Sequence, residues 1–160
     1  MSRDYSLLTA LRAAILAFVV TCCTDGAKAP AQQAVDDWMG CIECIDDELD
    51  RVVAFGSLVV PVLGAYAAYG PPGEHLDSVR AGENASYLRV IAAGMDTSRI
   101  RNLADVYVSN AIALYQARSG VALRRIGGPS AIQAFDQALA QPLRPDVRSQ
   151  LMALRDSTIP

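Results

Sequence analysis

The sequence has few aromatic residues and no stretch in which Val, Ile or Thr alternates with polar residues. Aromatic residues make up only 6% of the 160 residues, while hydrophobic residues as a whole, led by alanine and leucine, reach 52%. Alanine and leucine favour helices, whereas strands favour alternating β-branched and aromatic side chains. These absences argue against a β-sheet protein, and the composition predicts an all-α fold.

The sequence also lacks an excess or a cluster of positive charge. It carries 14 Lys and Arg against 17 Asp and Glu, for a net charge of −3 at pH 7. Nucleic acids and anionic membrane surfaces bind proteins through concentrated Lys and Arg. We therefore expect no nucleic-acid partner, and we expect contact with a membrane only through an N-terminal lipid anchor.

The sequence contains no arrangement typical of a catalytic or metal centre. The one histidine, His75, lies beside a Pro-Pro-Gly turn, where we expect a solvated loop residue. No Ser or Asp has a spacing to it that suggests a catalytic triad. A zinc site built on Cys41 and Cys44 would need two further His or Cys ligands. The sequence offers only His75 besides the N-terminal pair Cys22 and Cys23. We predict a protein without enzymatic activity, cofactor or metal.

The first residues have the pattern of a secretory leader. An unbroken apolar run at Ala13–Val20 follows a positively charged start. The run is too short to span a bilayer as a helix, which takes about 20 residues, but it suits the apolar region of a signal peptide. Residues 19–22 (V-V-T-C) resemble a bacterial lipobox, in which Cys22 would be lipidated, although Thr21 stands where that pattern has Gly, Ala or Ser.

Three other fates of this leader remain open. A signal peptidase could cleave near Ala29 or Ala31, the segment could stay as an uncleaved anchor, or the apolar run could be a buried helix of a cytosolic protein. We favour export to the cell envelope or periplasm, either as a soluble protein or as a lipoprotein anchored through Cys22. The predicted division is residues 1–22 as the leader, residues 23–35 as a tether and residues 36–160 as the helical-repeat domain.

Glycine, proline and capping residues divide that domain into helical segments. Acidic residues at positions 46–48 suit the positive end of a helix dipole, and Gly-Pro-Pro-Gly at positions 70–73 stops a helix. Gly82 and Asn84 interrupt the helical pattern of Glu74–Gly94, so we expect one kinked helix or two short ones there. In chain order, the predicted helices run from about residue 46 to Gly56, from Val60 to Gly70, through Glu74–Gly94, from Asp96–Ser98 to Gly127, from Pro129 to Gln141, and from Pro145 onward.

The turn at Gly127-Gly128 gives the sharpest structural prediction. One of these two glycines should adopt a left-handed backbone conformation that ends the preceding helix. Pro129 then opens the next helix, because a proline in the first turn loses no hydrogen bond. The expected inward face of that helix is Ile132, Phe135 and Leu139, and Gln137 is expected to face outward.

Two of the predicted turns repeat one another. Positions 52, 55 and 56 match positions 123, 126 and 127 at an offset of 71 residues, and positions 60, 63 and 67 match 132, 135 and 139 at an offset of 72. This spacing leaves room for one degenerate unit of about 36 residues between the two turns, which lies within the range of helical repeats. The repeated pattern predicts stacked helical hairpins.

These turns resemble those of a known repeat family. Residues 53–63 (V-A-F-G-S-L-V-V-P-V-L) resemble the A-L-G-x-x-A-V-P-x-L turn of HEAT-type repeats, and residues 122–132 (A-L-R-R-I-G-G-P-S-A-I) resemble the same turn in the shorter, bilin-lyase-like HEAT variety. The resemblance covers about half of the chain after the leader. It implies a short, irregular array of antiparallel helical hairpins, a HEAT-like superhelix, and a scaffold that binds other proteins.

The pair Cys41 and Cys44 is the one motif with chemical potential. In an exported protein we expect these residues to form a disulfide, with free or interchain thiols as the second interpretation. In a reducing compartment the same spacing suits a thioredoxin-like redox pair or half of a zinc site, but such a redox motif follows a strand, and no strand pattern is present. The alternative function is therefore a thiol-redox protein of the envelope that uses this pair.

Three aromatic side chains are candidates for contact with a protein partner. Trp38 either covers the hydrophobic end of the first hairpin or anchors a partner. Tyr66 and Tyr69 lie on the helix face opposite Val60 and Leu63, which in a superhelix can line a concave groove. Packing of the two tyrosines against the middle helices is the simpler interpretation. Together with the leader, these features predict an exported protein-interaction or scaffold module.

Overall fold

A computed structural model describes residues 29–41, 47–97 and 102–159 of the chain. Within these ranges the chain forms α-helices and one short 3-10 helix, without a strand, so the predicted all-α fold is confirmed. The identification of HEAT-type hairpins stays a prediction. The elements are α2 (Pro30–Gly40), α3 (Asp47–Ala54), η1 (Gly56–Val59), α4 (Val60–Tyr69), α5 (Gly73–Ala92), α6 (Leu103–Ile126), α7 (Gly128–Leu139) and α8 (Pro145–Asp156).

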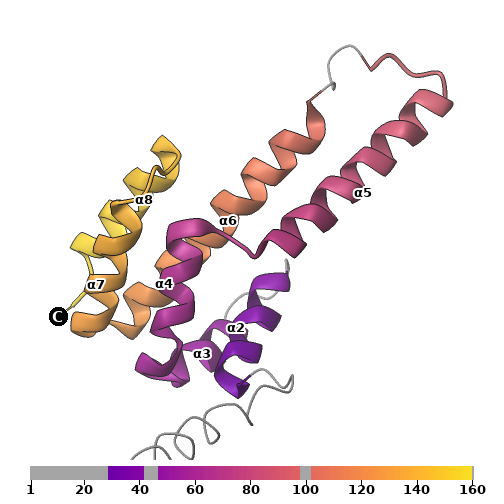
Figure 1. The fold of residues 1–160 in the computed structure, drawn as a ribbon. Helices are drawn as coiled ribbons and strands as arrows, with labels where there is room; N and C mark the ends of the chain where they lie inside the picture. The colour runs from indigo at the N-terminus through magenta and orange to yellow at the C-terminus, as the bar shows by residue number, and fades with distance from the viewer. Residues whose placement is uncertain (1–28, 42–46, 98–101, 160) are drawn as a thin grey trace, which may run out of the picture.

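Helix α6 is the element against which most of the others pack. It contacts α3, α4, α5, α7 and α8, and α4 also packs on α7 (Figure 1). Gly120 lets α8 approach closely, since a Cβ atom at this position would lie 2.5 Å from Cδ2 of Leu151. The largest apolar side chains that are fully buried come from seven different elements and form one core: Phe135, Leu63, Leu123, Leu151, Val35, Val52 and Val59.

Helix α4 ends at a glycine that packs directly on α6. Gly70 has a φ of 77° and donates its N–H to the carbonyl oxygen of Tyr66 at 2.9 Å. A Cβ atom there would lie 2.9 Å from Cγ2 of Ile112 on α6. The two prolines that follow cannot continue the helix, so the chain turns here into α5.

Both glycines of the turn between α6 and α7 have a positive φ, whereas the sequence predicted this for one of them. Gly127 has a φ of 68° and Gly128 a φ of 79°. The N–H of Gly127 donates to the carbonyl oxygen of Leu123 at 3.0 Å, and that of Gly128 donates to the carbonyl oxygen of Ile159 at 3.0 Å. The segment after α8 thus returns to this turn and satisfies one of its amides.

The helical part begins earlier than the predicted boundary at residue 36. Residues 30–35, predicted to be part of a tether, form the first half of α2. Pro30 suits the first helical turn, and the alanines and glutamines after it are good helix formers. Val35, Trp38 and Met39 then lie at helical spacing and are buried. The predicted leader, with Cys22, lies outside the described residues.

Helix α5 and the first half of α6 form a pair that extends away from the rest of the molecule (Figure 1). We call α5 together with residues 103–115 of α6 the arm. Of the two arrangements expected near Gly82 and Asn84, two short helices is wrong, because α5 is one helix of 20 residues. No side chain of α5 is buried, which sets this helix apart from the others.

The described residues contain no single helix that is long and apolar enough to cross a membrane, although the bent pair Asp47–Ala54 and Gly56–Tyr69 passes the same test of length and composition.

Candidate functional site

Trp38 joins α2 to α6 and is only 3% exposed. The guanidinium carbon of Arg118 lies 4.6 Å from the centre of the indole ring. The same guanidinium donates to the carbonyl oxygens of Trp38, at 2.7 Å, and of Cys41, at 2.8 Å. A cation at the C-terminal end of a helix interacts favourably with the helix dipole. Burial lowers the pKa of Arg118 from its ordinary value.

Tyr66 belongs to a hydrogen-bonded cluster between α2 and α4. Its hydroxyl donates to Oδ1 of Asp36 at 2.6 Å, and Nε2 of Gln32 donates to the same carboxylate oxygen at 2.9 Å. The Tyr66 ring packs edge-to-face on Tyr115, with the ring centres 5.5 Å apart. Burial, and then the neighbouring Asp36 carboxylate, raise the pKa of Tyr66 well above its ordinary value. This side chain stabilises the packing of α4 against α2 and α6 and is not accessible to a partner.

The structure does not bring the three aromatic candidates onto one surface. Trp38 and Tyr66 are buried, whereas Tyr69 is 66% exposed. Tyr66 and Tyr69 are neighbours on one helix, but α2 covers only the first of them. The sequence could not reveal this difference, because the path of α2 across α4 is set by contacts between residues distant in the chain.

The other candidate residues lie apart from the exposed tyrosine. Cys41 follows the last turn of α2, whereas reactive thiols of CxxC motifs lie at helix N-termini. Cys44 and Cys22 lie outside the described residues, so the disulfide, the redox pair and the lipid anchor stay predictions. His75 is not a solvated loop residue: it lies in the first turn of α5, half-buried, with its ring centre 5.2 Å from that of Tyr115.

Large apolar side chains are exposed mainly along the arm. Ten large hydrophobic side chains are exposed in the described residues, and six of these lie on the arm or directly after α5, each between 45% and 64% exposed. They are Leu88, Ile91, Met95, Val106, Tyr107 and Leu114. Large apolar side chains that stay exposed, when they gather on one part of a molecule, are typical of an interaction surface.

A groove of about 480 Å³ runs between the two helices of the arm. We call it the arm groove. Its walls come from successive turns of α5 (residues 75–83) and α6 (residues 107–115), and the end of α2 closes it on the side of the core. Gly82 has no side chain to fill it. Its lining includes Met39, Val79 and Leu114, the rings of His75, Tyr107 and Tyr115, and the polar side chains of Ser78, Glu83 and Asn110.

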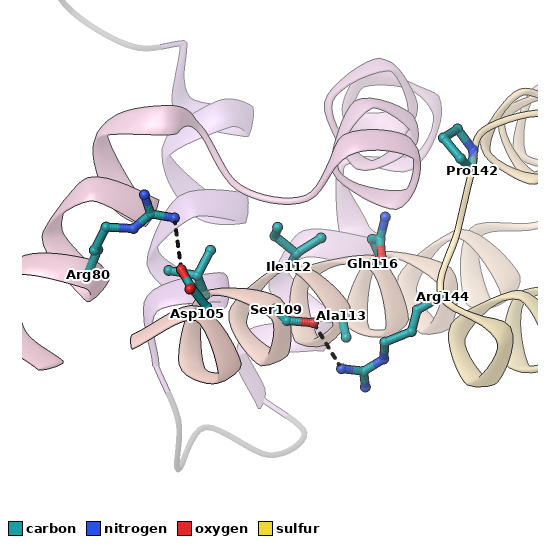
Figure 2. Close-up of a pocket in the computed structure, with 9 residues that line it drawn as sticks. Arg80, Asp105, Ser109, Ile112, Ala113, Gln116, Pro142 and Arg144 are labelled. Carbon is teal, nitrogen blue, oxygen red and sulfur yellow. Dashed lines mark hydrogen bonds and ion pairs between the residues drawn. The ribbon is translucent and has the colours of Figure 1, made fainter. Parts of the chain in front are cut away.

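A second hollow, of about 310 Å³, lies between α5, α6 and the connection from α7 to α8 (Figure 2). An arginine stands at each side of it, and each is paired with an aspartate. Arg80 lies 3.6 Å from Asp105, and Arg144 lies 2.7 Å from Asp146, whose pKa this hydrogen bond lowers to about 2. Arg144 also reaches Ser109 on α6. Because both guanidiniums are neutralised, this hollow offers no spare charge to an anion.

Within the described parts of the chain, no three His, Cys, Asp or Glu side chains come close enough together to hold a metal ion. The arm and its groove therefore remain as the candidate functional site. Sequence reasoning missed it, since it searched for chemistry at the cysteine pair and for binding at Trp38, Tyr66 and Tyr69. The signal that could have indicated it was the weak amphipathicity of Glu74–Gly94, a helical stretch without a clear apolar stripe to bury.

Comparison with protein-family models, with curated proteins and with solved structures finds no match for this chain.

Proposed function

We propose that this protein is a non-catalytic interaction module of the cell envelope that binds another protein through the exposed apolar side chains of its arm. One observation carries the proposal: α5 is 20 residues long, yet none of its side chains is buried. A helix of a globular protein normally buries an apolar stripe, and the stability of helices in proteins comes mostly from that burial. Helix α5 would bury its apolar side chains, and gain this stability, by binding a partner.

The size of the expected gain supports a protein partner. Burying one fully exposed Leu or Ile side chain contributes about 1.5–3 kcal/mol. Leu88 and Ile91 lie one turn apart on α5, and Val106 lies on α6. Burying any of them against a partner would remove apolar surface from water, as the buried centre of an interface does, and the polar residues of the arm suit a solvated rim.

Site-specific photo-crosslinking in cells that produce the protein tests this proposal. A photoreactive amino acid at Leu88 or Val106 should give the same covalent adduct with a second protein, and Leu88→Ser combined with Ile91→Ser should abolish the adduct formed from Val106.

The matched control uses apolar residues outside the arm. Leu58 is 73% exposed and Met152 is 49% exposed, so both present a similar surface on other elements. A photoreactive residue at either position should not give this adduct, and Leu58→Ser combined with Met152→Ser should leave the Val106 adduct intact. If the adducts from the arm and from these control positions are the same, the arm is not the binding surface.

A further inference from the structure

We infer that the arm groove is a binding site for a small organic cation with an apolar body, such as an alkylammonium or arylalkylammonium compound. The inference does not rest on the proposed protein contact, whose test uses Leu88, Ile91 and Val106, none of which lines the groove.

The shape of the groove favours a small molecule over a helix. Its volume of about 480 Å³ falls within the range of about 300–1,000 Å³ that is typical of small-molecule pockets. Met39 and Gly40, at the end of α2, close it on the side of the core. The stretch from His75 to Glu83 covers about two helical turns. A partner helix that followed the groove would meet α2 within that distance.

The charge of the groove favours a cation. Glu83 is the one acidic residue in the lining, and no Lys or Arg lines the groove. The Glu83 side chain is half-buried, and within the described residues its carboxylate takes part in no ion pair or hydrogen bond. By contrast, the aspartates of the second hollow are each paired with an arginine. The arm groove therefore holds a negative charge that a bound cation would neutralise.

The rings that line the groove point to the same ligand class. Tyr107 and Tyr115 stand on one side and His75 on the other, with Leu114 and Met39 adding apolar surface. The face of a tyrosine ring attracts a cation within about 6 Å, and the attraction grows where water is excluded. A carboxylate in a groove lined by aromatic and apolar side chains, without a competing basic side chain, suits an ammonium group attached to a hydrocarbon body.

Three probes of matched size test this inference on the full chain. They are 4-phenylbutylammonium, 4-phenylbutan-1-ol and 4-phenylbutanoate, which share a phenyl ring on a four-carbon chain and carry a positive, a neutral and a negative head group. Backbone amide NMR titrations should show the amine perturbing residues of the groove and binding about threefold to fivefold more tightly than the alcohol, as expected for one partly exposed charge pair. The carboxylate should bind more weakly than the alcohol. Equal affinities of the amine and the alcohol would overturn the inference.

Two variants locate the effect. Glu83→Gln should reduce the affinity of the amine to that of the alcohol, whereas Glu74→Gln, on an exposed first-turn residue of α5 outside the groove, should change nothing. A preference for the amine that survives Glu83→Gln would also overturn the assignment. A synthetic amphipathic helix of about 18 residues with one lysine on its apolar face tests whether the groove instead binds a helix of another protein. If it displaces the amine and binds at least as tightly, the groove receives a protein and not a small molecule.

Discussion

Phe135 is the largest of the side chains that the structure buries completely. Phe135→Ala should lower the free energy of unfolding by about 3–5 kcal/mol, because it removes a buried ring and leaves a cavity. Gln137→Ala, two residues along the same helix and exposed to solvent, should change stability by less than about 0.5 kcal/mol. Chemical denaturation of the two variants measures both effects. Equal losses would mean that the orientation of α7 is wrong.

Tyr66 should make stability depend on pH in the alkaline range. Its folded pKa is raised above the ordinary value of 10.0 by burial and by Asp36, so the neutral phenol is favoured by the fold. The stabilisation that follows from this raised pKa is complete below pH 10. It is lost as the pH rises above that value, because the phenol of the unfolded chain then ionises while that of the folded protein does not. Denaturation curves between pH 9 and about pH 11 should therefore be less pH-dependent for Tyr66→Phe than for the wild type.

Tyr69 provides the control for this experiment. It lies on the same helix but is 66% exposed. Tyr69→Phe should leave the alkaline loss of stability as it is in the wild type. If both substitutions have the same effect on the pH profile, the loss comes from the sum of the tyrosines and not from the cluster of Tyr66 with Asp36.

The inward face of α7 shows where prediction from sequence fails at this scale. The sequence predicted Ile132, Phe135 and Leu139, and of these only Phe135 is fully buried. The rest of the buried face is made of alanines: Ala131, Ala134 and Ala138. A Cβ atom on Gly64 of α4 would lie 3.2 Å from Cβ of Ala134, so α4 and α7 meet through small residues. A pattern that looks for large side chains inside a helix cannot detect a contact of this kind.

Two glycines in the interiors of α5 and α6 should respond in opposite ways to the same substitution. Gly120→Ala gains helix propensity of about 1 kcal/mol but places a methyl group 2.5 Å from Cδ2 of the buried Leu151. Overpacking of a filled core costs about 1–3 kcal/mol, so the net effect should be destabilising. Gly82→Ala meets nothing within 4 Å and should stabilise by about 0.4–1 kcal/mol. Thermal melts of the two variants test the pair, and a stabilising Gly120→Ala would contradict the close packing of α6 against α8.

The boundaries of most helices could be predicted because they depend on local backbone chemistry. The stops at Gly70 and Gly127 and the starts near Val60 and Pro145 agree with the structure, since a glycine with positive φ or a first-turn proline acts within one or two residues. Two short helices, one of the two arrangements expected around Gly82, do not form, because one exposed glycine costs too little to interrupt a helix of 20 residues. The candidate site was not predicted, because it depends on how little of α5 is covered by segments distant in the chain.

For the whole molecule, the predicted route to the cell envelope has a direct test. Cells grown with a palmitate analogue should label the wild type in the membrane fraction, and Cys22→Ser should abolish the labelling. Cys23→Ser is the matched control and should retain the label. Label that survives Cys22→Ser would contradict lipidation at that residue, and full-length protein in the cytosol would contradict export.

The repeat interpretation belongs to this scale as well. Each of the two matching sequence turns lies between two α-helices, the first between α3 and α4 and the second between α6 and α7. Each lies next to a glycine with positive φ, Gly56 in the first and Gly127 in the second. Only the second turn joins two helices directly, because η1 occupies the first. A HEAT-like superhelix therefore stays a proposal.

Helix α6 belongs to both the arm and the core, and this gives the arm a mechanical property. Its 24 residues extend for about 36 Å at the usual rise per residue. Its first half lies beside α5 and its second half packs against α7 and α8, without a proline between them. Swinging the arm would require breaking hydrogen bonds inside this helix. The arm is therefore stiff. A partner bound to it, as proposed, would be held at a fixed distance and orientation from the body of the protein.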